Sequence, residues 1–357
     1  MKPLSRWFVL CAGMWLGGTA WGVLPSVRVL HFPVDRELGL LVDLDRPNSA
    51  VEASDWWWMN PAAHYARYAL ARGNVKVAAR TRLGLVLNPA ECRDLAPFAE
   101  LPSGVIEVVS LQTGLQFGTI GLHQWVAQAP PDDRTLARIC ALPGLRELHL
   151  DGAQLTNAGL AALEKVDSLE RLCLIMSGLD REGIAHLGRL HSLEGLRVHT
   201  GAPMQREDLA PLAQLDGLEE LNLGWYWLDA RWPELFAALP PFTRLRRLLY
   251  FMPMVGGGGG REVLTDRTLA TLARLPALES IQLYNGTCTA KGIAELTRLP
   301  KLAVLELPGS FVHSDAVLTE VAKMKSLRRL YVRRRGLSYK GKMRLKEVVP
   351  RCEVKVR

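Results

Sequence analysis

The chain has 357 residues, of which 48% are apolar and 22% are charged, and its formal net charge is +8. These values are normal for a globular or repeat protein with a large core. No long window combines low hydrophobicity with high charge, which excludes extensive disorder beyond the N-terminus.

The N-terminal sequence MKPLSRWFVLCAGMWLGGTAWG has the three parts of a secretory signal peptide. Two basic residues precede an apolar stretch, and Ala20 and Gly22 suit cleavage before Val23. We therefore expect residues 1–22 to direct export to the periplasm, the cell surface or the medium. The alternative is an uncleaved N-terminal anchor, because this stretch could nearly span a bilayer. No later segment of the sequence is long and apolar enough to do so.

Residues 23–81 are predicted to form a small β-rich cap, with strands in VRVLHF, LGLLVDLD and ARGNVKVA. Within this region lies DWWWMN, residues 55–60, whose three adjacent tryptophans cannot all face a core from one strand. We expect one or two of these tryptophans to cover the open N-terminal end of the stacked elements predicted from residue 82 onward. The alternative is an exposed aromatic patch for a partner or a glycan.

A frame L-x-x-L-x-L repeats through the rest of the chain. It starts clearly at eight leucines, namely Leu145, Leu169, Leu193, Leu218, Leu245, Leu278, Leu302 and Leu327. Two weaker copies start at Ile106 and at about Arg82. The end of each frame alternates with period two, which predicts a short strand with one buried face.

Each predicted strand is followed by an apolar residue and then by a helical stretch. In the repeat from Leu145, the stretch NAGLAALEKV places Leu160, Leu163 and Val166 on one face. A single unit cannot bury these leucines, but stacked units bury them in a continuous column. The sequence therefore predicts an α/β solenoid over residues 82–357, with a parallel sheet on one side and helices on the other.

These frames, and the segment Leu-Thr-x-x-Gly-Leu at 155–160, resemble the leucine-rich repeat family, especially its ribonuclease-inhibitor-like and bacterial members. The resemblance implies a horseshoe whose concave sheet binds another protein, and it implies no catalytic residues. RLKEVVPRCEVKV resembles the closing helix and last strand of such proteins, with Val348, Cys352 and Val354 covering the core.

Extra residues interrupt the pattern at 112–130, 229–241 and 252–260, and the last of these insertions contains MVGGGGGR. Five consecutive glycines followed by Arg261 suggest a phosphate loop, but no Lys-Ser/Thr follows them and Glu262 has the wrong charge for an anion site. We expect a flexible insertion at the edge that also carries Trp225–Trp227. The alternatives are a mobile lid over the concave face and a phosphate site.

No sequence motif supports an enzyme, a metal site or a cofactor, so we expect a non-catalytic protein without either. The cysteines that follow the leader are odd in number and widely spaced, which argues against a disulfide framework or a zinc site. Cys92 and Cys288 fall at or near buried positions of the frame. Cys173 instead faces the open side of the sheet, where its sequence neighbours give no evidence of reactivity.

The frame also predicts which side chains face outward from the sheet. They are Glu147, His149, Asp151, Arg171, Cys173, Arg197, His199, Glu220, Asn222, Arg247, Phe251, Gln282, Tyr284, Glu306, Arg329, Tyr331 and Arg333. Because Tyr, Trp and Arg are enriched at binding hot spots, we expect a protein partner to bind one subset of outward residues and nearby aromatics. This subset is Arg197, His199, Trp225, Tyr226, Trp227, Arg247, Phe251, Tyr284, Tyr331 and Arg333.

The charge is concentrated at the C-terminal end. Residues 326–357 contain twelve Lys or Arg and two Glu, a net charge of +10, so residues 1–325 sum to −2. A basic end attracts anionic polymers or membrane surfaces, which gives the alternative function, whereas the expected export makes nucleic acid an unexpected partner. The alternative to a binding role is an ordinary terminal repeat whose basic side chains are simply exposed to water.

Overall fold

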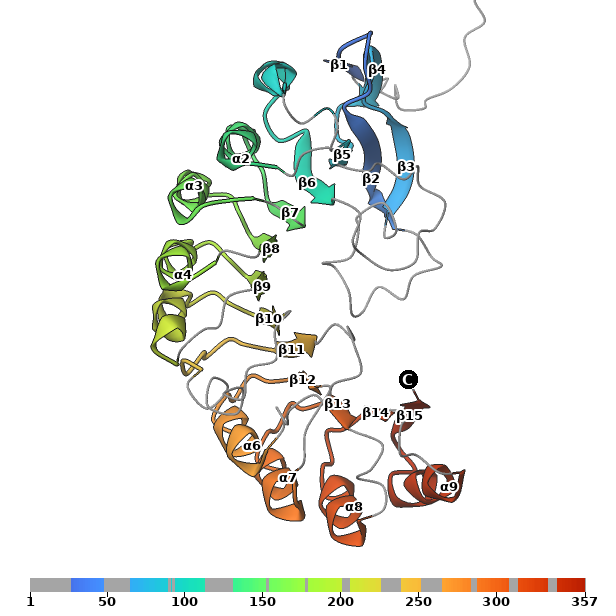
Figure 1. Cartoon of the computed structure of the whole chain (residues 1–357). Coiled ribbons are helices and arrows are strands. Elements are labelled where there is room, and N and C mark those ends of the chain that lie inside the picture. The colour runs from blue at the N-terminus through green and yellow to red at the C-terminus, as the bar shows by residue number, and fades with distance from the viewer. Residues whose placement is uncertain are drawn as a thin grey trace, which may run out of the picture.

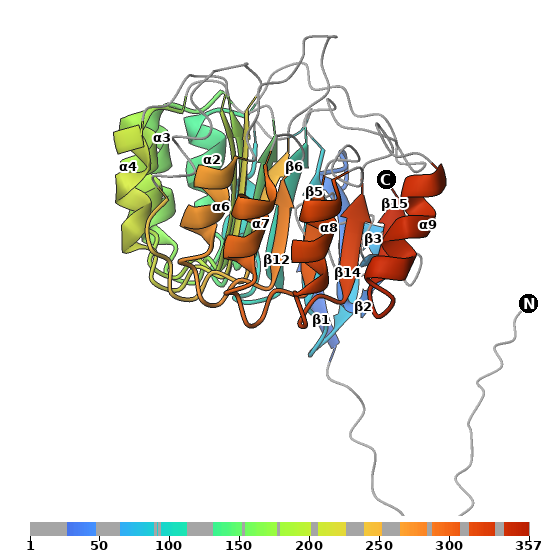
Figure 2. The same ribbon diagram turned by 90° about the horizontal axis from the view of Figure 1, so that it is seen from below.

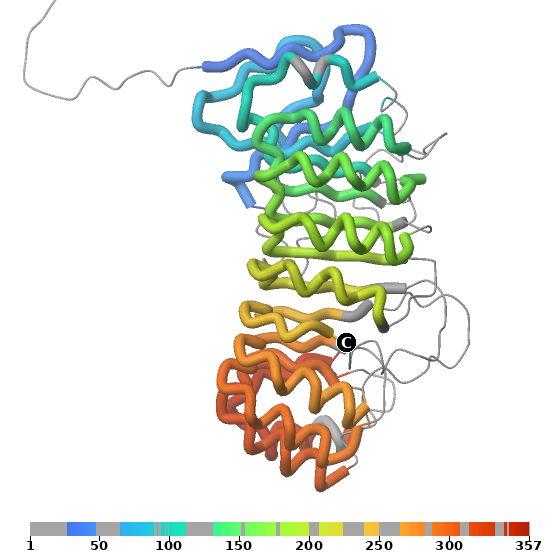
Figure 3. The backbone as a smooth tube through the Cα atoms, turned by 90° about the vertical axis from the view of Figure 1, so that its left-hand side faces the viewer, coloured from blue at the N-terminus to red at the C-terminus, as the bar shows by residue number. Residues whose placement is uncertain are grey.

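The computed structural model describes residues 27–47, 65–88, 91, 94–112, 131–151, 154–176, 179–200, 206–225, 239–251, 265–283, 288–307, 314–332 and 339–356. They form a crescent with strands on its inner curve and helices on its outer curve (Figure 1). The same two layers appear from below (Figure 2), and the helices stack along the outer side (Figure 3). The predicted α/β leucine-rich repeat solenoid is confirmed.

The elements are short, as repeats of about 25 residues require. The strands are β1 Val27–His31, β2 Gly39–Pro47, β3 Tyr65–Leu70, β4 Asn74–Ala78, β5 Leu83–Leu87, β6 Ile106–Gln112, β7 Glu147–Asp151, β8 Arg171–Met176, β9 Gly195–Thr200, β10 Glu220–Trp225, β11 Arg247–Phe251, β12 Ser280–Leu283, β13 Val304–Leu307, β14 Arg329–Val332 and β15 Glu353–Val356. The α-helices are α2 Asp133–Cys140, α3 Asn157–Leu160, α4 Arg181–Gly188, α6 Asp266–Leu272, α7 Ala290–Leu296, α8 Asp315–Ala322 and α9 Tyr339–Val348. The 3₁₀ helices are η2 Ala96–Glu100, η3 Leu163–Lys165 and η4 Arg206–Gln214.

Thirteen strands form one sheet in the order β15-β14-β13-β12-β11-β10-β9-β8-β7-β6-β5-β2-β3. Neighbours from β5 to β15 are parallel, while β2 pairs antiparallel with both β5 and β3. The other two strands, β1 and β4, form a separate antiparallel pair. The three strands predicted at the N-terminal end are therefore present as β1, β2 and β4, whereas β3 was not predicted. Two cap strands, β2 and β3, continue the solenoid sheet.

The leucines of the frame form the core. Leu145, Leu148 and Leu150 are buried, and equivalent residues of later repeats join them in one continuous apolar cluster. Leu160, Leu163 and Val166 are buried as predicted, but their segment forms only a short α-helix followed by a 3₁₀ turn. Each added repeat therefore stabilises its neighbours mainly by removing leucine surface from water.

Backbone hydrogen bonds join successive repeats at the strand starts. Glu170 N donates to Arg146 O, Glu194 N to Glu170 O and Glu219 N to Glu194 O, each at 2.8 Å. A serine just before the frame adds a side-chain bond to the first leucine carbonyl of the previous repeat, also at 2.8 Å. These pairs are Ser168 with Leu145, Ser192 with Leu169 and Ser326 with Leu302. The serine thus satisfies a carbonyl that the turn leaves out of the sheet.

A second link joins the helices on the convex side. The first residue of α2, Asp133, accepts hydrogen bonds from the N–H and hydroxyl of Thr156, which caps α3, at 2.9 and 2.7 Å. Asp266 of α6 does the same for Thr289, the cap of α7, at 2.7 Å for both bonds. These carboxylates share in the capping of the next helix, whose first N–H groups have no partner within the helix.

The last repeat closes the core much as predicted. Val348, Cys352 and Val354 are partly buried and pack against the main apolar cluster. Cys288 is buried at the frame position held elsewhere by Leu155 and Leu179, as expected. Within the part of the chain that the structure describes, none of the helices has the length and apolar character needed to cross a membrane.

The helix-to-helix link explains the glycine of the Leu-Thr-x-x-Gly-Leu segment and its relatives. A Cβ atom on Gly292 would lie 2.3 Å from Asp266 Oδ1 and 2.8 Å from Asp266 Cα. We expect Gly292→Ala to lower the free energy of unfolding by about 1–3 kcal/mol, because the helices must separate. Gly217→Ala is the matched control, since its Cβ would meet its nearest atom at 3.4 Å. Urea denaturation measures both, and equal stabilities would contradict this account.

Candidate interaction surface on the concave sheet

The register of the strands arranges the concave side chains in rows. We call one of them the middle row, which consists of Ser110, His149, Cys173, Arg197, Asn222, Leu249, Gln282, Glu306, Tyr331 and Lys355. Most of its side chains are polar and, except for Lys355, all are buried. Neighbouring strands lie about 4.8 Å apart, so each of these side chains stands beside those of the next strands.

A second row lies where the strands begin, and we call it the strand-start row. It includes Glu147, Arg171, Glu220, Arg247, Arg329 and Glu353. Each arginine pairs with a glutamate of an adjacent strand: Arg171 with Glu147, Arg247 with Glu220, and Arg329 with Glu353. The arginine side chains remain 37%, 45% and 28% exposed, so this row presents charge to solvent.

Two of the predicted binding residues, Arg197 and His199, lie together on β9. Arg197 Nε approaches His199 Nε2 at 3.2 Å, and the two residues are only 5% and 1% exposed. Burial, and then the neighbouring Arg197 charge, hold the pKa of His199 well below its usual range. His199 is therefore neutral at physiological pH. The repeat frame correctly predicts that Arg197 and His199 lie on the concave face of the sheet, but it does not predict that they are buried.

Other predicted binding residues differ in exposure. Arg247 is exposed, whereas Tyr331 is fully buried with the guanidinium of Arg329 5.9 Å from its ring centre. The backbones of Trp225 and Phe251 end strands β10 and β11. The other candidates lie outside the described residues, as do the leader, the tryptophans at 56–58, Cys92 and the glycine run. These candidates are Tyr226, Trp227, Tyr284 and Arg333. The binding role of the whole set stays a prediction.

A polar cluster on β7 and β8 was not anticipated from the sequence. His149 Nε2 lies 2.6 Å from Glu147 Oε1, and Arg171 Nε lies 2.5 Å from Glu147 Oε2. Glu147 and His149 are almost inaccessible, and Cys173 on the next strand is the register neighbour of His149. The repeat frame could have predicted this cluster, because residues one repeat apart in the sequence, such as Glu147 and Arg171, lie side by side on adjacent strands.

The electrostatics of this cluster favour charged groups. Burial opposes ionisation of Glu147, but its bonds with His149 and Arg171 keep its pKa below the usual value. Burial also opposes the charged form of His149, yet its neighbours Cys173 and Glu147 raise its pKa to about 9. The cluster therefore contains a buried carboxylate between two cations. No three His, Cys, Asp or Glu side chains in the described ranges are placed to hold a metal ion.

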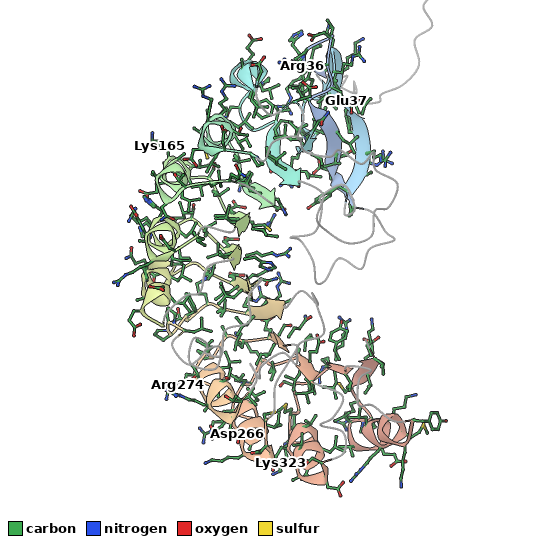
Figure 4. The ribbon with its side chains drawn as sticks, viewed as in Figure 1. Arg36, Glu37, Lys165, Asp266, Arg274 and Lys323 are labelled. Atoms are coloured by element: carbon green, nitrogen blue, oxygen red, sulfur yellow. The ribbon has the colours of Figure 1, made fainter. Side chains whose placement is uncertain are left out.

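The convex side and the C-terminal end carry exposed charge of a different kind. Lys165, Arg274 and Lys323 project outward along the helices (Figure 4). At the C-terminal end Lys340 and Lys346 of α9 are exposed, and Tyr339 on the same helix is 81% exposed. Lys340 and Lys346 thus lie on the surface of α9 and not in the core.

The buried carboxylate makes the cluster sensitive to truncation. We expect Glu147→Ala to lower the free energy of unfolding by about 2–3 kcal/mol, because it leaves the buried His149 without its carboxylate. Because Arg171 is partly exposed, we expect this loss of stability to be smaller than that for breaking a fully buried ion pair. In the matched variant Glu353→Ala, which breaks an exposed pair with Arg329, we expect the unfolding midpoint to stay unchanged. Denaturant titrations with equal midpoints for both variants would contradict the expected difference.

No protein-family model matches the chain, and no curated protein matches its sequence. Its structure is similar to internalin C2 of Listeria monocytogenes, with 17% identity over 69% of this chain and 93% of that chain, and a TM-score of 0.40. It is also similar to an internalin of the same organism, with 13% identity, coverage of 74% and 72%, and a TM-score of 0.35. A third similar structure is the Rad7 and Elc1 complex of yeast, with 17% identity, coverage of 73% and 77%, and a TM-score of 0.40.

These likenesses are too weak to decide the fold, so the assignment is based on the chain's own features. The frame L-x-x-L-x-L recurs eight times, and its described copies supply the parallel strands from β7 to β14. Its leucines fill one continuous core between those strands and the outer helices. The chain therefore has the leucine-rich repeat solenoid fold.

Proposed function

We propose that the chain is a non-catalytic recognition protein that binds a protein partner through the concave face of its sheet. The observation that carries this proposal is the strand-start row. Arg171, Arg247 and Arg329 stay partly exposed there while a glutamate on an adjacent strand holds each of them. A guanidinium already fixed by an ion pair loses less conformational entropy on binding, and arginine is enriched at binding hot spots.

The middle row gives independent support. Buried polar side chains such as Asn222 and Gln282 cost free energy that leucine or valine would not. The opposite face of the same strands already holds the sheet on the leucine core. Stability alone therefore does not account for the polar residues of the middle row; because they are buried, they would support the exposed arginines of the strand-start row and not touch a partner themselves.

We assign direct partner contacts to the exposed Arg247 and to five aromatic residues that the repeat frame predicts near it. These are Trp225, Tyr226, Trp227, Phe251 and Tyr284, and Arg333 extends the set toward the C-terminal end. Buried Arg197, His199 and Tyr331 would shape the surface from beneath. We also propose that the leader directs export, so that the partner belongs to the cell envelope or its surroundings.

Affinity capture tests the concave surface. The wild-type chain, cross-linked in envelope fractions, is expected to retain a partner through peptides of β9 to β12. In Trp225→Ala/Arg247→Ala/Phe251→Ala, capture should fall at least about tenfold, because hot-spot side chains each contribute about 2 kcal/mol or more.

The control for this capture is Arg274→Ala, on the convex side just after α6, which should capture as the wild type does. Unchanged capture by the concave variant, or cross-links confined to the helices, would refute the proposal.

The exposed basic charge of α9 favours a second candidate function, binding of an anionic polymer or membrane surface. Lys340, Lys346 and Tyr339 are all exposed on this terminal helix, and Arg328 and Arg351 are exposed near it. Lysines beside an exposed aromatic side chain are suited to the interface between an anionic surface and water.

Salt dependence distinguishes this second candidate from the first. Binding to vesicles of anionic phospholipid, or to heparin, should weaken steeply with added salt. Lys340→Glu/Lys346→Glu should reduce it at least about tenfold, at roughly 1 kcal/mol per basic residue. Lys165→Glu/Arg274→Glu makes the same change of charge elsewhere on the convex side and should bind as the wild type does. Equal losses in both variants would show a general charge effect and contradict a role for α9.

A further inference from the structure

Helix α9 lies beside α8 at one end of the outer layer, and its rotation about its own axis is fixed by two contacts (Figure 1). On the inner side, Leu345 is 1% exposed and belongs to the main apolar cluster, as does Val349 just after the helix. Arg344 forms an ion pair with Asp315, the first residue of α8. These contacts determine which side chains of α9 point away from the protein.

The side of α9 that points away from the core is centred on Met343. Tyr339 precedes Met343 by four residues, so the two side chains lie on one face of the helix, and they are 81% and 45% exposed. Lys340 and Lys346 stand three residues before and after Met343, which places them about 60° to either side of it. Both lysines are exposed. An apolar strip thus has a basic side chain on each flank.

Exposed apolar side chains of this size are otherwise absent from the helices in the part of the chain that the structure describes. Apart from the pair on α9, the large apolar side chains that are well exposed lie in the N-terminal cap, and they are Val27, Val29, Val34 and Leu70. The outward residues of a solenoid helix are usually polar, because the inner face alone contacts the core. The apolar strip of α9 is therefore not required by the repeat architecture.

The charge of α9 also departs from that of other helices in the outer layer. Four helices have an acidic residue in the first turn, where the helix dipole favours it; these are α2, α4, α6 and α8, with Asp133, Glu182, Asp266 and Asp315. Helix α9 has none there and carries Lys340 instead. A cation at this end opposes the dipole. Helix stability therefore does not account for Lys340, whereas an anionic ligand does.

The combination of charge and apolar surface separates a bilayer from a soluble polyanion. A polyanion neutralises Lys340 and Lys346 but offers nothing apolar to cover Met343. The boundary of an anionic bilayer offers both, because phosphates lie above the start of the acyl chains. Tyrosine is suited to that boundary, since its ring is apolar and its hydroxyl remains hydrated.

One exposed group opposes such binding. Glu347 follows Met343 by four residues and is exposed on the same side of the helix. Its carboxylate is repelled by anionic headgroups, but the two lysines outnumber it, and Arg351 adds an exposed cation shortly after the helix. The outward side of α9 is therefore positively charged in sum, and Glu347 sets a limit on its affinity.

We propose that α9 docks on an anionic phospholipid bilayer by inserting Met343 and Tyr339 into the interface while Lys340 and Lys346 contact the phosphates. This inference rests on the second candidate function, binding through α9, and specifies its target and its apolar contact. The docking uses none of the residues assigned to the concave surface, so a protein partner and a bilayer bind the chain at separate places.

The test measures protection of α9 itself, so that membrane contacts made elsewhere in the full chain do not enter. Amide hydrogen exchange of peptides covering residues 339–349 is followed while vesicles of phosphatidylglycerol and phosphatidylcholine are added. Tyr339→Ser/Met343→Ser should need at least about tenfold more lipid for half protection than the wild type, because the apolar contact is lost. Its protection by heparin should equal that of the wild type, since its lysines are unchanged.

Two further variants control for general effects. Leu70→Ser removes an apolar side chain of similar exposure, 49%, from β3 in the cap and should titrate as the wild type does. Glu347→Gln should need at least about threefold less lipid, because a repelled carboxylate is removed. A gain of this kind cannot come from unfolding, and thermal melts establish that the serine variant is folded.

The outcomes separate this inference from the function on which it rests. If Tyr339→Ser/Met343→Ser titrates as the wild type does while Lys340→Glu/Lys346→Glu loses protection, insertion is wrong and charge-driven binding through α9 stands. Protection by heparin but not by vesicles would overturn the bilayer in favour of an anionic polymer. If neither ligand protects α9, both the inference and the second candidate function are wrong.

Discussion

The structure depends on the burial of leucines that no single repeat can cover. In each repeat Leu148 and Leu150, or their equivalents, face inward from a strand of only a few residues. Neighbouring repeats remove these side chains from water, so stability grows with the stack and not within one unit. The serine and carboxylate bonds between repeats then set the register in which the stack is built.

Because the register is fixed, residues one repeat apart become neighbours in space. His149 and Cys173, for example, are 24 residues apart in the sequence but lie opposite each other on adjacent strands of the sheet. Polar chemistry on the concave side can therefore be assembled from residues that carry no local motif. The exposed arginines proposed for recognition and the buried pair of Glu147 and His149 both arise in this way.

The spacing of leucines predicted the solenoid, its core and the closing helix and strand, because burial repeats with a period that is visible in the chain. It also predicted which side of the sheet carries Arg197, His199 and Cys173. It did not predict that these residues are buried, since periodicity identifies a face and not what lies over it. The Glu147–His149–Cys173 cluster was missed because its three members belong to two repeats. The strand Tyr65–Leu70 was missed because its sequence, YARYAL, lacks clear alternation between buried and exposed positions.

The carboxylate links on the convex side have a mechanical consequence. Asp133 and Asp266 each reach from one helix to the capping threonine of the next, so they set the spacing of the outer layer. The sheet sets the spacing of the inner layer through its backbone bonds. The difference between the two spacings is the curvature of the crescent. A side chain one methylene longer at these positions would open the outer spacing and bend the solenoid more tightly, which would change the width available to a partner without altering any residue on the concave face.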